Sequence, residues 1–435
     1  MNQSLYKDHS FSPRLVIRAI VLCALAVNLG WVLTHAPRTH DEYIEIARHL
    51  SAGRGYALLI AGAPEPTHFR APLYPLLLAL ALRPDQTSLY LVTIAQALLG
   101  AATCLPVYGL GRRLFGERVG LLAAFLTALD FPLVVMSGWV LTERLYVFLI
   151  ALAAYLVIGD AFRTRWRALV AGLVFGLAIL TRSEAELYLL LLLVSSVLLS
   201  PERAKSLKNG ALAAVVALAC LAPWLWRNHV TLNSWAVSDP IFVDYNLYRG
   251  AADIREDQTE YGFNFYLALR EGRSPFDAAQ RFDSPAERRR IRQEVLSQWT
   301  KLIVERPGAV AKKRFYNLYK LWIYRGEFFF TESIGLIEAV RTRRLANLFL
   351  KLAFYTFYGL LPALLAAVGA WLAARNGEWR VSLLLWLYPL IITAMMIPLW
   401  ADYRYNLPSH VLLAPLVALA LIKLGTRCVA AFNWQ

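Results

Sequence analysis

Charged residues are scarce in this chain. Only 17% of its 435 residues are Asp, Glu, Lys or Arg, whereas 58% are hydrophobic and the mean hydropathy is +0.46. A soluble protein of this length needs a more polar surface, because that surface faces water. The low charge therefore argues against a soluble protein and indicates one embedded in a bilayer.

Cysteines and phosphate-binding motifs are also few. Cys23, Cys104 and Cys220 lie inside apolar stretches, and Cys428 lies in the C-terminal tail. No two of them are placed for a disulfide outside the membrane, and none has metal-ligand spacing. The chain has no glycine-rich phosphate loop, so a nucleotide cofactor is not expected. These patterns require no cofactor. They leave open whether the protein binds a divalent cation.

Long apolar runs are the main feature that the chain does have. Several reach the roughly 20 residues that a helix needs to cross about 30 Å of hydrocarbon. The runs cover residues 15–34, 88–110, 119–136, 144–159, 167–181, 186–199, 210–226, 347–374, 381–400 and 408–425. We expect an all-α polytopic membrane protein with about ten transmembrane helices, juxtamembrane helices and a small helical extracytoplasmic segment.

The net charge of +15 is unevenly distributed between the apolar runs. Basic residues cluster in alternate connections, such as 112–118, 163–167 and 203–208, and the intervening short connections carry few. This is the positive-inside pattern, so the charge does not require a nucleic-acid partner. It predicts that both termini are cytoplasmic and that residues 35–70 and 227–346 lie outside.

This topology divides the chain into three parts. Residues 1–226 form a transmembrane module with the first outer loop, 227–346 an extracytoplasmic helical segment, and 347–435 the C-terminal transmembrane helices. In the first outer loop, Asp41 is a suitable N-cap for an amphipathic helix that Gly53 would end, and the apolar segment 73–82 is expected at the membrane face. In the second segment, helices are expected from about 285 and 309.

Ionisable residues gather at the outer ends of the apolar runs. They are Asp41 and Glu42 after the first run, Glu143 before the fourth, Arg182 and Glu184 after the fifth, Arg227 after the seventh, and Asp402, Arg404 and Tyr405 after the ninth. Each alone could be a helix-end residue that reaches to water, and Asp41 and Glu42 could simply cap a helix. Together they place carboxylates and arginines on one face, which suits an anionic headgroup beside a general base.

Arginine is informative about the ligand. A guanidinium offers a fixed fork of donors that matches phosphate oxygens, and it stays charged near lipid. Arg70, Arg182 and Arg404 could therefore hold a lipid phosphate at the membrane surface.

Several short motifs resemble those of GT-C integral membrane glycosyltransferases. The run THDEYIEIAR at 39–48, followed by GRGY at 53–56 and RAPLYP at 70–75, is similar to their first luminal loop. The nearest branch contains protein O-mannosyltransferases and lipid A aminoarabinose transferases. Further matches are GRRLFG at 111–116, LTR at 180–182, PW and RN at 223–224 and 227–228, and RY at 404–405 with Pro408. Where relatives often have Lys–Pro–Pro, this chain has Arg70–Ala71–Pro72.

The resemblance implies a GT-C fold and a set of residue roles. Asp41 would be the base that deprotonates the acceptor, with Glu42 and Glu143 as further catalytic carboxylates. Arg70, Arg182 and Arg404 would bind the donor phosphate. The remaining residues of the substrate cavity would be His40, Tyr74, Glu184, Arg227 and Tyr405, and no protein metal site is implied.

The activity so implied is transfer of a sugar from a polyprenyl-phosphate donor to a hydroxyl of a lipid, glycan or protein, with inversion at the anomeric carbon. The expected location is a bacterial inner membrane, with the site facing the periplasm or exterior. A transporter or flippase of lipid-linked glycans is the alternative. It predicts polar residues near mid-bilayer and two related halves. Here the polar residues gather at one face and no repeat is visible, which favours the enzyme over the transporter and over a non-catalytic scaffold.

Overall fold

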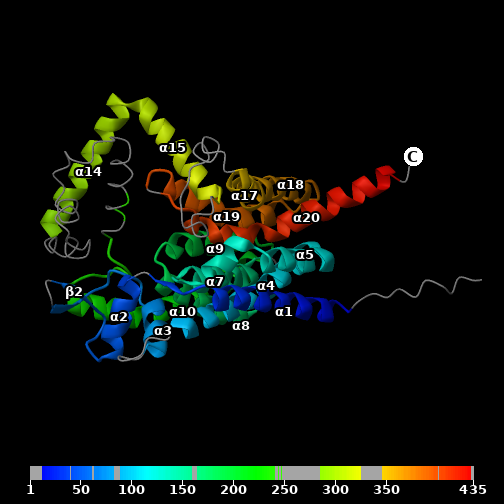
Figure 1. Cartoon of the computed structure of the whole chain (residues 1–435). Helices are drawn as coiled ribbons and strands as arrows, with labels where there is room; N and C mark the ends of the chain where they lie inside the picture. Colours follow the sequence, from blue (N-terminus) through cyan, green and yellow to red (C-terminus); the bar gives the residue numbers. More distant parts are fainter. Residues whose placement is uncertain are drawn as a thin grey trace, which may run out of the picture.

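The computed structural model describes residues 12–39, 41–60, 63–82, 89–158, 164–240, 243, 246, 285–324, 345–399 and 401–432. Most of these residues are helical, and the long helices form one bundle (Figure 1). Helix α1 (Pro13–Thr34) begins and α20 (Leu407–Phe432) ends at the same end of this bundle. The opposite end carries α2 (Asp41–Ser51) and α14 (Pro285–Glu305). Which end is cytoplasmic stays a prediction.

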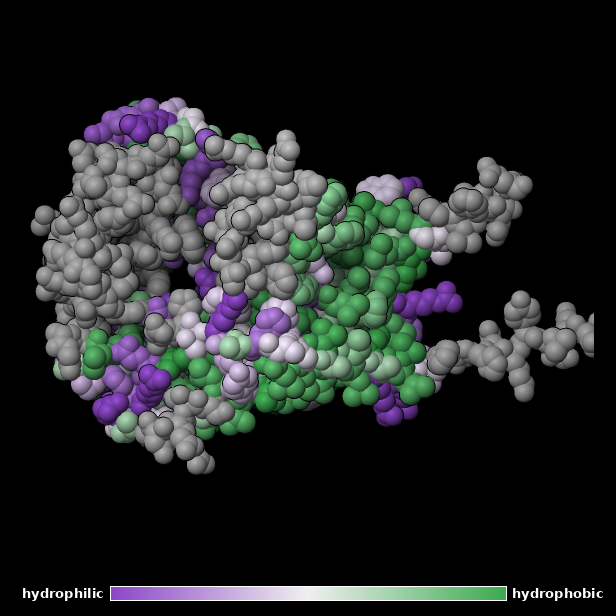
Figure 2. Space-filling model, in the orientation of Figure 1, coloured by the Kyte–Doolittle hydropathy of each residue, from purple (hydrophilic) through white to green (hydrophobic). Residues whose placement is uncertain are grey.

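The predicted fold class is confirmed. Six helical spans among the described residues are long and apolar enough to cross a membrane. They are α1, α4 (Leu89–Phe115), α10 (Arg203–Leu232), Phe349–Arg375, α19 (Trp379–Met396) and Tyr403–Thr426. The other four apolar runs form shorter helices, α5 (Glu117–Ala128), α7 (Glu143–Val157), α8 (Arg165–Thr181) and α9 (Ala185–Leu198). The count of about ten spans stays a prediction. Figure 2 shows hydrophobic side chains over much of the bundle and hydrophilic ones near α2 and α14.

Small residues let the helices approach closely. A Cβ on Gly172 of α8 would collide with the backbone carbonyl oxygen of Ala213 in α10. A Cβ on Gly369 of α18 (Leu361–Arg375) would collide in the same way with Leu416 of α20. In a bilayer the hydrophobic effect does not drive helices together, because the lipid chains are as apolar as the side chains. Close van der Waals packing at small residues holds the helices together instead.

Two irregular turns interrupt the C-terminal helices. The π-helix η2 (Thr356–Leu360) joins α17 (Leu345–Tyr355) to α18. The 3₁₀ helix η3 (Tyr403–Asn406) leads directly into α20. π-helical turns inside α-helices are often found at functional sites. Both turns here border the cavities described below.

The first outer loop folds around α2. Strand β1 (Arg38–Thr39) pairs in parallel with β4 (Trp139–Val140), and β2 (Ala57–Ile60) pairs with β3 (Ala63–Pro66) in a hairpin. The predicted helix at Asp41 is confirmed, and Gly53 follows it with φ of +72°, a conformation that favours glycine. The predicted helix at 73–82 is α3 (Leu73–Ala81). The hairpin was not predicted.

The second outer segment contains the two expected helices, α14 and α15 (Pro307–Trp322). Helix α15 docks on the end of α19: the Asn317 amide donates to the carbonyl oxygens of Ile397 and Leu399, at 3.0 and 2.7 Å. Arg314 also donates to Ile397, at 2.7 Å. These bonds satisfy carbonyls that a helix end leaves without intrahelical partners.

Candidate active site

Three arginines at one end of the bundle are set by short local structures. Arg182 is the C-cap of α8, and its N–H donates to the carbonyl oxygen of Ala178. Arg404 lies in η3, where its N–H donates to the Asp402 carboxylate at 3.0 Å. Arg70 lies between the β2–β3 hairpin and α3. The fold thus collects, from three distant segments, the residues that the sequence predicted as phosphate contacts.

Glu143 joins two of these arginines. Its Oε1 lies 3.1 Å from Nη1 of Arg182 and 3.8 Å from Nη1 of Arg404, and its side chain is only 5% exposed. Each arginine has a second carboxylate partner, Glu184 at 2.6 Å and Asp402 at 3.3 Å respectively. Buried charges are tolerated when they are paired in this way. Glu143 is therefore a shared counter-ion that holds the start of α7, the end of α8 and η3 together.

Arg70 forms a second pair beside this network. Its Nη2 lies 2.9 Å from Oε2 of Glu42, and its guanidinium lies 5.1 Å from the ring centre of Tyr43. Burial raises the pKa of the Tyr43 hydroxyl, while the positive charges of Arg70 and Arg182 oppose that rise. Tyr43 thus lies within the field of both arginines and packs between the two ion-pair groups.

A cavity of about 490 Å³ opens beside these residues, and we call it the arginine cavity. Its polar lining includes Arg70, Arg182 and Glu184, with Tyr43 and Tyr405. Its apolar lining includes, among others, Met395 and Met396 at the end of α19, Leu399 just after it, and Leu187 of α9. Arg404 and Glu143 are not among the lining residues; Glu143 contacts Arg182, and Arg404 contacts Glu143. The lining therefore combines charged side chains with apolar ones.

Two of the predicted cavity residues do not line this cavity. Tyr74 is buried, and its hydroxyl donates to Oε1 of Gln96 at 2.8 Å. Arg227 donates to the carbonyl oxygens of Thr67 and Tyr56, at 2.6 and 2.9 Å. Tyr74 therefore anchors α3 to α4, and Arg227 anchors the first outer loop to α10.

The predicted base lies at the start of α2. The backbone of Asp41 begins this helix, but its side chain and the whole of His40 lie outside the described residues. The roles of Asp41 and His40 therefore stay predictions. The two residues that follow Asp41, Glu42 and Tyr43, both contact Arg70, so the N-terminus of α2 lies beside Arg70.

Sequence reasoning missed one wall of the arginine cavity. Ser238 and Asp239 line it, and Ser183 contacts Ser238 through their hydroxyls at 2.7 Å. The Asp239 N–H donates to the carbonyl oxygen of His68 at 3.0 Å, which ties this wall to the first outer loop. No periodic pattern marks these residues in the sequence. Within the part of the chain that the structure describes, no group of three or more His, Cys, Asp or Glu residues is arranged for a metal ion.

Comparison with known proteins supports the predicted resemblance. Residues 69–226 match the family model described as dolichyl-phosphate-mannose-protein mannosyltransferase. No curated protein matches the chain. The apo structure of the Archaeoglobus fulgidus oligosaccharyltransferase is similar, with a TM-score of 0.56 and 17% identity over 99% of this chain and 52% of that one.

Two further solved structures are similar. The archaeal oligosaccharyltransferase AglB of the same organism, in complex with an inhibitory peptide and a dolichol-phosphate, has a TM-score of 0.52 and 17% identity, over 97% of this chain and 51% of that one. ArnT from Cupriavidus metallidurans, bound to undecaprenyl phosphate, has a TM-score of 0.43 and 16% identity, over 93% and 77%. This chain thus spans about half the length of the oligosaccharyltransferase structures. The resemblance to GT-C glycosyltransferases is confirmed.

Proposed function

We propose that this chain is a membrane glycosyltransferase that transfers a sugar from a polyprenyl-phosphate donor to a hydroxyl acceptor on the extracytoplasmic face. The observation that carries the proposal is the arginine cavity, whose lining brings Arg70 and Arg182 together with the apolar Met395 and Met396 of α19. A lipid phosphate has this dual character, since an anionic group is joined to a long hydrocarbon chain. Arginine pairs well with phosphate oxygens even beside hydrocarbon.

The proposed reaction is a single displacement. The acceptor hydroxyl oxygen attacks the anomeric carbon, the bond from that carbon to the phosphate oxygen breaks, and the hydroxyl proton passes to a carboxylate. The polyprenyl phosphate leaves with the bonding electrons, and Arg70 and Arg182 stabilise the charge that develops on it. Asp41 is the proposed base, because Glu42 is paired with Arg70. Base assistance contributes about 10²–10⁴-fold.

Glu143 has a supporting role in this proposal. Its carboxylate is buried and contacts both Arg182 and Arg404. A carboxylate held in this way is a poor proton acceptor for a substrate hydroxyl, but it fixes the positions of the guanidiniums. The alternating basic connections support an orientation with the cavity outside the cytoplasm, in a bacterial inner membrane.

The proposal can be tested with purified protein in vesicles and a panel of polyprenyl-phosphate sugars carrying a labelled sugar. We expect at least one sugar to be transferred to an acceptor. Asp41→Asn keeps the size of the side chain but removes its basicity, so turnover should fall about 10²–10⁴-fold while donor binding persists. Glu65→Gln, at an exposed carboxylate of the same loop, is the matched control. Turnover by Asp41→Asn near the unmodified rate would exclude Asp41 as the base.

A further inference from the structure

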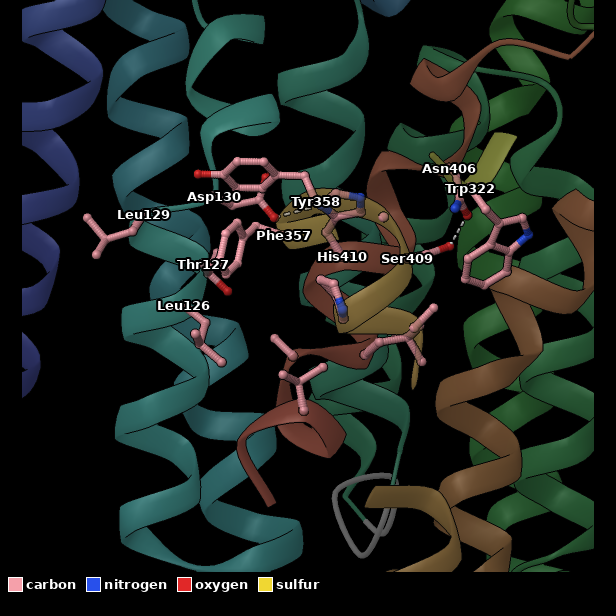
Figure 3. Close-up of a pocket in the computed structure, with 16 residues that line it drawn as sticks. Leu126, Thr127, Leu129, Asp130, Trp322, Phe357, Tyr358, Asn406, Ser409 and His410 are labelled. Carbon is pink, nitrogen blue, oxygen red and sulfur yellow. Dashed lines mark hydrogen bonds and ion pairs between the residues drawn. The ribbon is translucent and has the colours of Figure 1, made fainter. Parts of the chain in front are cut away.

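A second cavity, of about 300 Å³, lies between the C-terminal helices and the turn that joins α5 to α6 (Phe131–Met136) (Figure 3). We call it the lateral cavity. Leu129 and Phe357 line it and are 42% and 60% exposed. Phe357 lies in the membrane-spanning helix Phe349–Arg375, and Leu129 ends the apolar helix α5. Both exposed side chains are apolar, so the opening is suited to contact with hydrocarbon.

The cavity contains one acidic and one basic side chain, and they form a pair. Nδ1 of His410 lies 2.6 Å from Oδ2 of Asp130, and Nε2 of His410 lies 2.6 Å from the Tyr403 hydroxyl. That hydroxyl donates to the carbonyl oxygen of Tyr358 at 2.7 Å. Tyr403 has one proton to donate, so Nε2 of His410 must donate to it. One proton then lies between His410 and Asp130, and whichever group holds it, the pair has no net charge.

Asn406 provides an unused hydrogen-bonding group in this cavity. Its side chain lines the cavity, the residue is only 2% exposed, and its Oδ1 accepts from the Ser409 hydroxyl. No described residue makes a hydrogen bond with its amide nitrogen. The nitrogen is open to the cavity, and polar groups in such positions normally find a partner. The amide can therefore donate to an oxygen acceptor of a ligand in the cavity.

The two cavities share one wall. Consecutive residues of η3 serve both, because Tyr405 lines the arginine cavity and Asn406 lines the lateral cavity. Arg404, between Tyr403 and Tyr405, is held by Glu143. A charged phosphate suits the arginine cavity. The neutral lateral cavity suits an acyl chain that carries an uncharged ester or hydroxyl oxygen.

We propose that the lateral cavity binds the acceptor, and that this acceptor is a membrane lipid. Its acyl chain fills the cavity, and an ester or hydroxyl oxygen accepts a hydrogen bond from Asn406. The inference rests on the proposed function and narrows its acceptor class. Two reactants that are both confined to the bilayer need two openings to hydrocarbon, whereas a peptide or free glycan arriving from water needs no second one.

The test uses the full chain in vesicles of phosphatidylethanolamine and phosphatidylglycerol. The probe is a phosphatidylethanolamine with a photoactivatable diazirine in its acyl chain, and the crosslinked peptides are mapped. We expect crosslinks to α5, η2 or α20 at the cavity. Ala414→Phe, which fills the cavity from α20, should remove them. Leu421→Phe, on the exposed side of α20, is the control and should keep them. Displacement of the probe by polyprenyl phosphate would overturn the proposal, because the cavity would then hold the donor chain.

Sugar transfer is measured in the same vesicles, and the label is separated into lipid-extractable and water-soluble products. Asn406→Leu should raise the KM for a lipid acceptor about fivefold, the effect of one lost hydrogen bond, and leave the KM for the donor unchanged. Label found only in water-soluble product, at an unchanged rate in Asn406→Leu, would overturn the lipid acceptor while the proposed function stands. If no sugar is transferred at all, the proposed function fails, and specific crosslinking would still establish the lateral cavity as a lipid site.

Discussion

The arginine cavity and the lateral cavity lie on either side of η3 and differ most in charge. The first is lined by two guanidiniums, each paired with carboxylates, and the second contains a pair without net charge. The difference indicates how a protein surrounded by hydrocarbon can distinguish two lipids. Chains are chemically alike, so charge near the membrane surface must select the headgroup. Each of the following predictions tests whether this division of roles holds.

The largest effect is expected at Arg182. Arg182→Ala removes the nearer of the two arginine partners of Glu143 and also the arginine partner of Glu184. Breaking a buried ion pair from one side is expected to cost about 3–5 kcal/mol, because the remaining charge is left uncompensated. Thermal unfolding in detergent measures the loss. Arg203→Ala, at an exposed position on α10, is the control. An Arg182→Ala variant as stable as the control would show that the network does not hold the helix ends together.

A smaller effect, confined to the donor, is expected at Arg70. A charge-assisted bond to phosphate contributes roughly 1.5–3 kcal/mol, so Arg70→Ala should weaken donor binding about tenfold or more. Arg70→Lys should recover part of the loss, since it keeps the charge without the fork of donors. Donor titrations on folded, monodisperse protein measure this, with exposed Arg54→Ala as the control. Equal donor affinity in Arg70→Ala would exclude Arg70 as a phosphate contact.

The smallest of these effects is expected in the lateral cavity. Asp130→Leu removes the carboxylate partner of His410 and the N-cap of α6, which should lower the free energy of unfolding by about 1–3 kcal/mol. The double variant Asp130→Leu with His410→Phe should recover part of this loss, because replacing both members of a buried pair by apolar groups costs less than removing one. Donor affinity should not change in either variant. A tenfold fall in donor affinity would contradict the separate roles of the two cavities.

Much of the fold follows from the sequence, because its causes are local. The apolar runs become helices, α2 begins at Asp41, and Gly53 follows its end. The β2–β3 hairpin was missed because Pro64 and Pro66 exclude helix without specifying strand. Its register depends on pairing with residues that the local pattern does not identify.

The site was predicted less completely, because side-chain direction depends on distant contacts. Spacing along the chain places Arg182 and Arg404 at one membrane face, and the structure brings both to Glu143. The spacing along the chain gives no sign that Arg227 donates to backbone carbonyls instead of lining the cavity. The contact between Asp130 and His410 joins residues 280 positions apart, and neither residue has a motif around it.

Helix α15 connects the two cavities in a way that has a thermodynamic consequence. Asn317 binds the end of α19, whose Met395 and Leu399 line the arginine cavity, and Trp322 of the same helix lines the lateral cavity. The Trp322 indole N–H also donates to Thr393 of α19 at 3.0 Å. A ligand that moves α15 in one cavity therefore changes the wall of the other. Occupation of one cavity should then change the affinity of the other, and the two lipids must alter each other's affinity by the same factor. The donor affinities of the lateral-cavity variants are therefore compared at equal occupancy of that cavity.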